Sequence, residues 1–252
     1  MSNIIYEVRN GIAVIKFNRP EKLNTLTLEM YDELGKAFVK AQESDDVGVV
    51  ILIGEGEKAF YVGADLTESI PYLNEGHYID EWDAAHFKHI KMNKPVIAAI
   101  NGFEIMLGTD IRIASNKAIF ALPEVSLGIV PAGGTLVRLS RQIPFVKAME
   151  LILTGEKIDS AKALDFGILN YVVEPDDVMN KAEEIANILL SNSTIAMQIA
   201  KESVIKLREI PLEQAFETEA MLGYKAFTSN DAKEGLDAFY NKRKAVFPSS
   251  KW

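Results

Sequence analysis

The chain has 252 residues, 48% of them hydrophobic and 25% charged, which is typical of a globular enzyme that buries a large core. The absence of cysteine excludes disulfides and thiolate chemistry, and the net charge of −9 argues against a general nucleic-acid binder. The first ten residues lack the features of a signal peptide, and no apolar run approaches the ~20 residues of a membrane span. We therefore expect a cytoplasmic protein with no nucleic-acid or membrane partner.

The N-terminal quarter combines strand and helix signals. Residues 4–8 and 12–17 read as two strands of a hairpin, joined by the turn signal Arg-Asn-Gly. Apolar residues at helical spacing predict a helix over residues 27–44, with Thr27 as its N-cap. The continuous apolar run 47–54 predicts a strand that is covered on both faces.

The rest of the chain continues this alternation and then becomes helical. Residues 67–93 are mixed and favour helix, and the next strands are expected at 95–100, 110–115, 118–122 and 169–174. Helices are expected at 132–143, at 144–156 with Gly155 as the stop, and at 159–168 with Asp159 or Ser160 as the cap. Beyond Pro175 nearly every segment has a helical pattern. We predict an α/β core domain of residues 1–190 followed by a helical part of residues 191–252.

The segment "KAFYVGADL", residues 58–66, follows the predicted strand 47–54 and contains Gly63. Gly63 permits an unusual backbone angle, so the N–H of Ala64 can point into a cleft and act as an oxyanion donor. The alternative is an ordinary turn into a helix with Asp65 as the N-cap. The segment alone favours that alternative.

Two glutamates stand in places that suit acid–base chemistry. Glu104 follows the strand 95–100 in "NGFE", where Gly102 offers another backbone amide, and Glu124 follows a proline in an apolar stretch. A pair of glutamates in a desolvated cleft can divide the roles of general acid and general base. The alternatives are a first-turn helix position for Glu104, where the helix dipole favours a negative charge, and a local hydrogen bond for Glu124.

Several motifs in one order resemble a known family. They include "NRPEKLN", "KAFYVGADL", "KPVIAAING", "DIRIAS", "FALPEVSLGIVPAGGTLVRL", "AMELILTGE" and "ALDFGILNYVV", and they cover the chain from about residue 5 to its end. Together they are similar to the crotonase superfamily, the enoyl-CoA hydratase/isomerase family. The resemblance implies a spiral of ββα repeats with a helical C-terminal trimerisation part. It also implies self-association as a trimer or a dimer of trimers.

The resemblance assigns roles to individual residues. Glu104 and Glu124 match the two catalytic glutamates, which would hold a water that adds across the 2,3 double bond of an enoyl-CoA thioester. Ala64 matches the first oxyanion donor. Coenzyme A enters as part of the substrate, and no permanently bound cofactor is implied.

The same resemblance suggests where the substrate lies. The stretch Val62, Ala64, Asp65 and Leu66 matches the backbone along the coenzyme A adenine. Lys22, and Lys242 or Arg243, are candidates for its phosphates, with a solvated surface position as the alternative. Trp82, Phe87 and Ile90 are candidates for the acyl pocket wall, with core packing as the alternative.

The segment "NGFE" departs from the family pattern. It is about six residues shorter than the Asn-Gly-to-glutamate motif of the family, and the missing piece includes the second oxyanion glycine. Three explanations stay open: an oxyanion hole rebuilt with Gly102 or Phe103, an impaired protein, or a loop omitted from the sequence.

Other patterns in the sequence give weaker indications of function. His77, His86 and His89 lie close together, but two histidines three apart on a helix are more often surface residues than metal ligands, so no metal site is expected. "PAGGT" lacks the Lys-Ser/Thr of a nucleotide-binding loop. The sequence thus favours an enoyl-CoA hydratase-type lyase. The alternatives are a double-bond isomerase of the same fold and an impaired homologue that acts as a scaffold.

Overall fold

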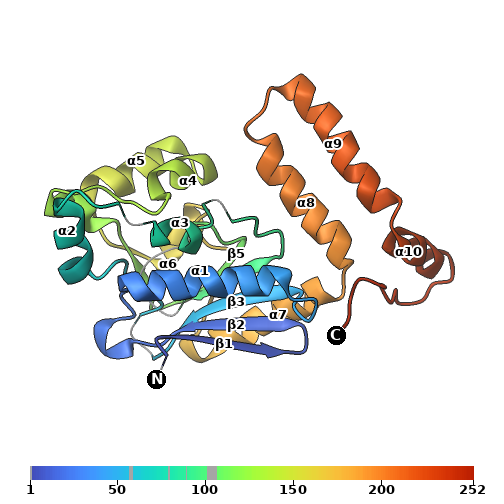
Figure 1. The fold of residues 1–252 in the computed structure, drawn as a ribbon, viewed down its shortest axis with the longest axis horizontal. Coiled ribbons are helices and arrows are strands. Elements are labelled where there is room, and N and C mark those ends of the chain that lie inside the picture. Colours follow the sequence, from blue (N-terminus) through green and yellow to red (C-terminus); the bar gives the residue numbers. More distant parts are fainter. Residues whose placement is uncertain (1, 57–58, 79, 89, 101–106) are drawn as a thin grey trace.

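The computed structural model describes residues 2–56, 59–78, 80–88, 90–100 and 107–252 (Figure 1). Its strands are β1 (Ile4–Arg9), β2 (Ile12–Phe17), β3 (Val49–Gly54), β4 (Val96–Ile100), β5 (Ile111–Ser115), β6 (Ile119–Phe120), β7 (Ile158–Asp159) and β8 (Tyr171–Val173). Its α-helices are α1 (Leu28–Glu43), α2 (Leu66–Asn74), α3 (Glu81–Ala85), α4 (Thr135–Gln142), α5 (Phe145–Thr154), α6 (Ser160–Asp165), α7 (Val178–Leu190), α8 (Thr194–Leu207), α9 (Leu212–Phe227) and α10 (Asn230–Tyr240). Three short 3-10 helices are η1 (Pro20–Lys22), η2 (Pro123–Leu127) and η3 (Pro175–Asp177).

A mixed sheet forms the centre of the molecule, with strand order β1-β2-β3-β4-β5-β8. The hairpin partners β1 and β2 are antiparallel, and every later pair is parallel. Parallel strands leave their carboxyl ends at one edge, which is where ligands bind in open α/β sheets. The predicted α/β class is confirmed.

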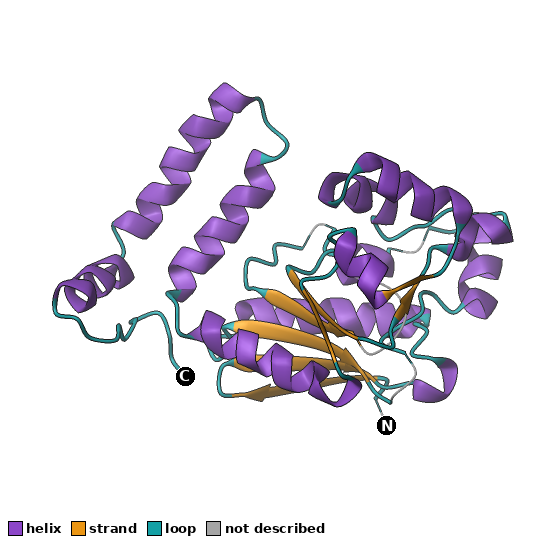
Figure 2. Ribbon diagram, turned by 180° about the vertical axis from the view of Figure 1, so that it is seen from behind, coloured by secondary structure: helices purple, strands orange, loops and turns teal. Residues whose placement is uncertain are grey.

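Both faces of this sheet are buried, as the apolar runs predicted. Alternate residues enter two separate clusters, since successive side chains of a strand point to opposite faces. In β2, Ala13 and Ile15 join a cluster with α1, whereas Ile12 and Val14 join one with α7. Figure 2 shows the sheet from behind, with α7 across it.

The helix ends follow from local chemistry. The side chain of Thr27 accepts a hydrogen bond from the Met30 N–H and starts α1, and Asp159 accepts one from the Lys162 N–H at the start of α6. Gly155 ends α5 in the left-handed conformation, with φ of 64°. These three predictions are confirmed.

Some segments differ from their predicted lengths. The segment 118–122 has only Ile119 and Phe120 in a strand, because it pairs with the two-residue strand β7 rather than with the main sheet. The helix expected over 159–168 is shorter at both ends, since Phe166 is the C-cap of α6 and Gly167 adopts a positive φ.

A buried arginine ties the end of the sheet to the helices above it. Arg112 of β5 is 7% exposed and donates to the carbonyls of Leu107, Thr109 and Ile168 and to the side chain of Gln142. The side chain of Gln142 also donates to the Leu107 carbonyl, at 2.8 Å. Burial lowers the pKa of Arg112 to about 10. These bonds fix Leu107 against α4, at the rim of the site.

The C-terminal helices extend away from the sheet. Helices α8 and α9 pack side by side as an arm, and α10 lies at the far end of the molecule from α2 (Figures 1 and 2). The tail then returns, since the Trp252 indole lies against Gly11 and Gly48 and donates to the Leu190 carbonyl. The division at residue 190 stays a prediction. Among the helices in the described part of the chain, none is long and apolar enough to cross a membrane.

Candidate active site

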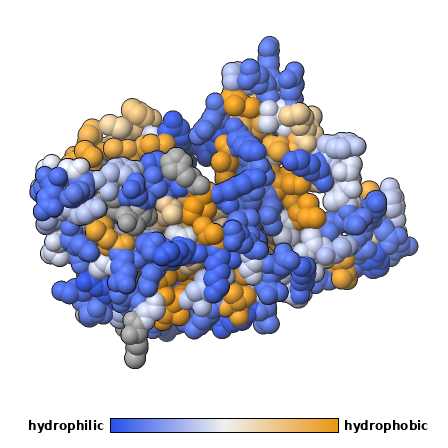
Figure 3. Space-filling model, viewed as in Figure 1, coloured by the Kyte–Doolittle hydropathy of each residue, from blue (hydrophilic) through white to orange (hydrophobic). Residues whose placement is uncertain are grey.

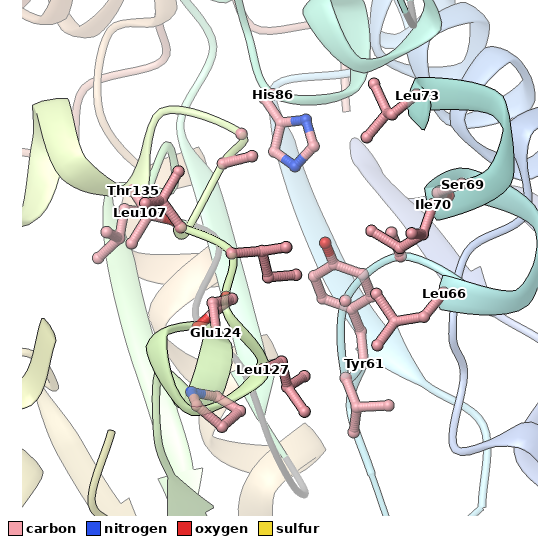
Figure 4. Close-up of a pocket in the computed structure, with 18 of the residues that line it drawn as sticks. Tyr61, Leu66, Ser69, Ile70, Leu73, His86, Leu107, Glu124, Leu127 and Thr135 are labelled. Carbon is pink, nitrogen blue, oxygen red and sulfur yellow. The ribbon is translucent and has the colours of Figure 1, made fainter. Parts of the chain in front are cut away.

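A cavity of about 530 Å³ lies beside the sheet. Segments on either side of it face each other, from residues 61–73 and from residues 121–138, and His86 lies at one end (Figure 4). Most of its lining is apolar, and its polar side chains are Tyr31, Tyr61, Ser69, His86, Glu124, Thr135 and Arg138. An apolar cleft with few polar groups is the usual form of a small-molecule site.

Glu124 is one of these polar groups. It lies in the first turn of η2, which Pro123 starts and Gly128 ends with φ of 75°. The carboxylate is half-buried, and its Oε2 has no hydrogen-bond partner among the described residues. Burial raises the pKa of Glu124 above its usual value, because desolvation disfavours the charged form. An acid with these properties suits proton transfer.

Ala64 lies on the opposite wall, in an isolated parallel bridge with Leu26. The Leu26 N–H donates to the Gly63 carbonyl at 3.0 Å, and the Leu26 carbonyl accepts from the Asp65 N–H at 2.8 Å. In this pattern the N–H of the intervening residue points away from the partner chain. Within the described part of the chain, no acceptor is found for the Ala64 N–H. Its place on the cavity wall suits a backbone donor to a ligand oxygen.

The carboxylate of Asp65 forms hydrogen bonds within the protein. Its carboxylate accepts from the N–H and the hydroxyl of Thr67, which caps α2, and from the guanidinium of Arg19 at 2.7 Å. The Thr67 hydrogen bond, followed by that of Arg19, lowers the pKa of Asp65. The predicted N-cap is therefore confirmed. Asp65 does not line the cavity, and its coenzyme A role stays a prediction.

The other predicted wall residues divide into three groups. Val62, Leu66 and Phe87 line the cavity with Ala64 and Glu124. Ile90 does not line the cavity and packs, partly buried, against the main core, which was the alternative for it. Gly102, Phe103, Glu104, His89 and the side chain of Trp82 lie outside the described residues, so their predicted roles stay predictions.

The predicted phosphate-binding cations do not line the cavity. Lys22 is exposed in η1, and Lys242 is exposed just beyond α10. Arg243 donates to Glu234 and Asp237 of α10, and the Arg243 hydrogen bond lowers the pKa of Glu234 to about 2. Within one chain, α10 and the cavity wall α2 are at opposite ends of the molecule (Figure 1). The roles of Lys22 and Lys242 stay predictions.

The structure adds six polar wall residues that the sequence did not single out for the cavity: Tyr31, Tyr61, Ser69, His86, Thr135 and Arg138. The guanidinium of Arg138 donates to the carbonyl of His86 at 2.6 Å and to that of Gly133 at 3.3 Å. Helical spacing put Tyr31 on the apolar face of its helix but does not distinguish a cavity wall from core. Among the described residues, no group of three or more acidic or histidine side chains is arranged to hold a metal ion.

Comparisons with known proteins point to one family. Residues 7–250 match the model of the family described as Enoyl-CoA hydratase/isomerase. A short-chain-enoyl-CoA hydratase of Clostridium acetobutylicum is 37% identical, over 97% of this chain and 97% of that protein. A mitochondrial enoyl-CoA hydratase of Pongo abelii is 38% identical, over 94% of this chain and 84% of that protein. The crystal structure of an enoyl-CoA hydratase from Bacillus anthracis superposes with a TM-score of 0.93 at 33% identity, covering 98% of this chain and all of that one.

Proposed function

The chain belongs to the enoyl-CoA hydratase/isomerase family, and we propose that it hydrates the 2,3 double bond of an enoyl-CoA thioester at the cavity around Glu124. It is an enzyme of this family with a crotonase-type fold, and its substrate is a coenzyme A thioester. The observation that carries the choice of site is Glu124, an acid with a raised pKa caused by burial, in an apolar cavity. No permanently bound cofactor enters this proposal.

The chemistry needs the carbonyl to be polarised first. We assign the Ala64 N–H as one donor to the thioester oxygen, where negative charge develops as water attacks. A donor that is already oriented costs no reorganisation, and the loss of one such donor typically lowers the rate by about 10²–10³. The Leu26 bridge supports this assignment, because it holds Gly63 and Asp65 on either side of Ala64.

Two carboxyl groups then handle the protons. One glutamate accepts a proton from the water as its oxygen bonds to C3, and the other delivers a proton to C2. Delivery is assigned to Glu124, because burial raises its pKa and lets it hold a proton more readily than an exposed glutamate. We assign Glu104 as the group that accepts the proton from water, because this residue matches a catalytic glutamate of the family. The net reaction adds one water and leaves the coenzyme A thioester intact.

Assembly is a second part of the proposal. Large apolar side chains are exposed on the C-terminal helices, among them Phe227 at 81%, Phe239 at 77% and Tyr240 at 76%. Figure 3 shows hydrophobic patches that interrupt the hydrophilic surface of the C-terminal helices. Exposed apolar patches of this kind mark interaction sites. We propose that copies of this chain cover them in a trimer or a dimer of trimers.

The test is a hydration assay on the purified protein. Crotonyl-CoA is the first substrate, and the decrease in enoyl thioester absorbance is followed together with the hydroxyacyl-CoA product. Glu124→Gln should lower kcat by about 10²–10⁴ if Glu124 transfers a proton. A product with a shifted double bond and no added water would instead identify an isomerase. Binding of acyl-CoA without any turnover would favour the scaffold alternative.

A further inference from the structure

The cavity wall formed by α2 carries a buried hydroxyl with no hydrogen-bond partner among the described residues. Ser69 of α2 is 0% exposed, and no described group forms a hydrogen bond with its Oγ. It lies on the same helix face as Leu66, Ile70 and Leu73, all of which line the cavity (Figure 4). A buried hydroxyl without a partner costs free energy, so its presence on a ligand cavity points to a partner on the ligand.

Two tyrosines on the lining of the same cavity also carry hydroxyls. The hydroxyls of Tyr31 and Tyr61 are 3.4 Å apart, and both residues are almost fully buried. The ring of Tyr31 lies 5.5 Å from that of His86, measured between centroids. Figure 4 shows the Tyr61 hydroxyl directed into the cavity. Four side chains, Tyr31, Tyr61, Ser69 and His86, thus line the same cavity with hydrogen-bonding groups, and we call them together the polar wall.

The polar wall is held rigidly at His86. His86 lies against Gly133, and the Arg138 guanidinium donates hydrogen bonds to the backbone carbonyls of both residues. Gly133 lets the imidazole approach closely, because a Cβ at this position would lie 2.5 Å from its Nε2. Among the described lining residues, Glu124 is the one acid. The polar wall therefore offers hydroxyl and imidazole groups but no carboxylate of its own.

We propose that the polar wall recognises an enoyl chain that carries a neutral oxygen substituent, a hydroxyl or a carbonyl, beyond the reacting double bond. The inference rests on the proposed function, because it names the acyl group of that same substrate. An oxygen at this position gives the Ser69 hydroxyl the partner that a methyl group cannot. A site built to hydrogen-bond a substrate rejects the analogue that lacks the polar group, since the protein group is then left unpaired. Bringing a carboxylate to the fully buried Ser69 would cost more than bringing a neutral oxygen, because a charge is more expensive to remove from water. The Arg138 guanidinium also lines the cavity, so the carboxylate is the competing substituent that the test has to include.

Binding tests this choice without depending on turnover. Saturated acyl-CoA thioesters are compared by calorimetry in matched sets, in which a terminal methyl group is replaced by a hydroxyl or by a carboxylate. We expect the hydroxyl form to bind about tenfold tighter than the methyl form, the range of one buried hydrogen bond. Equal or tighter binding of the methyl form would overturn the proposal. A preference for the carboxylate form over both others would overturn the neutral-oxygen assignment.

Variants then locate the preference. Ser69→Ala should remove most of the hydroxyl preference while leaving the affinity for the methyl form within a few fold, and Tyr61→Phe should also reduce it. Ser203→Ala is the matched control, because the Ser203 hydroxyl bonds within α8 to the Ile199 carbonyl, away from the cavity. Affinity for coenzyme A itself reports whether each variant keeps its site. An unchanged preference in Ser69→Ala contradicts the proposal.

Turnover separates this inference from the proposed function. If methyl-terminated enoyl-CoA is hydrated and the oxygenated thioesters bind no better, the polar wall proposal alone fails. If the oxygen preference is found in binding but no thioester is hydrated, the proposed hydration fails and the recognition stands.

Discussion

At the scale of the residue, the most informative group is the carboxyl of Glu124. Its protonated form is favoured by burial, which raises its pKa, and its backbone hydrogen bond opposes that shift only in part. A proton donor to C2 must be protonated when the substrate binds. A raised pKa extends the pH range in which this condition holds.

The first prediction concerns the pH dependence of hydration. In the wild type, kcat/KM should fall as pH rises through the pKa of Glu124, at a pH above the usual range of a glutamate, because the proton donor is then lost. Glu124→Gln should lack this limb and retain acyl-CoA binding. The measurement is a pH–rate profile with calorimetric binding at the same pH values. A limb that persists unchanged in the variant would assign it to another group.

The substitution Glu124→Gln should affect stability in the opposite sense to activity, which separates catalysis from folding. Because the folded pKa of Glu124 is raised, proton binding stabilises the folded state below the unfolded pKa, and this contribution is lost as pH rises through the folded pKa. Wherever the carboxyl is ionised, its buried charge is a cost that a glutamine does not carry. We expect Glu124→Gln to unfold in urea at neutral pH no earlier than the wild type. Lower stability there would mean that the carboxylate has a structural partner.

Asp65 gives a third prediction at this scale. Its Thr67 and Arg19 hydrogen bonds lower its pKa, so its contribution to stability is present above the unfolded pKa and is lost as pH falls through the folded pKa. Asp65→Ala removes the cap of α2 and should cost about 1 kcal/mol or more in the free energy of unfolding. Asp65→Asn keeps a cap and should cost less. Urea unfolding at neutral and acidic pH distinguishes them, and equal losses in both variants would exclude capping as the cause.

At the scale of the element, the turn before α4 sets the position of His86. Gly133 has φ of 59° and contacts the imidazole, whereas Gly167 has φ of 78° and no atom within 4 Å of an added Cβ. Alanine at either position should cost roughly 1–2 kcal/mol through its left-handed backbone. Only Gly133→Ala must also displace His86, so only this variant should weaken acyl-CoA binding. Similar affinities in the two variants, measured by calorimetry, would contradict this role.

The strands and the first helix could be predicted from local pattern alone. The apolar run 47–54 indicates a strand buried on both faces, and Thr27 stands at the start of a regular helical repeat, so each signal lies within a few residues. The strand 118–122 was predicted too long. Its length depends on pairing with residues 158–159, and a local pattern carries no information on a partner some forty residues away.

The candidate site divides in the same way. Glu124 and Ala64 could be singled out because each stands beside a proline or a glycine in a recognisable motif. Ser69 and Tyr31 could not, since both occur on amphipathic helix faces where sequence does not separate a cavity from the core. The place of His86 on the cavity wall depends on tertiary contacts, namely its hydrogen bond with Arg138 and its packing against Gly133, which a local pattern does not reveal.

At the scale of the whole molecule, the arm formed by α8 and α9, together with α10 beyond it, exposes aromatic side chains that one copy of the chain does not cover. Phe227 and Phe239 are each more than three-quarters exposed, on α9 and α10. A stable protein–protein interface buries about 1,200–2,000 Å² in total, and aromatic residues are enriched at its centre. Self-association through this arm is therefore the expected state of the enzyme.

The last prediction tests this surface directly. Replacing Phe227 and Phe239 together by glutamate should shift the mass in light scattering from a multiple of 27.9 kDa to that of one chain, because charges would be buried without partners. Lys225→Gln, an exposed change on the same helix, should leave the assembly intact. Since Glu124 and Ala64 come from one chain, any activity lost on dissociation would show that a neighbouring copy supports the site. A wild type that is monomeric at micromolar concentration, or a double variant with unchanged mass, would contradict the assignment of these helices to the interface.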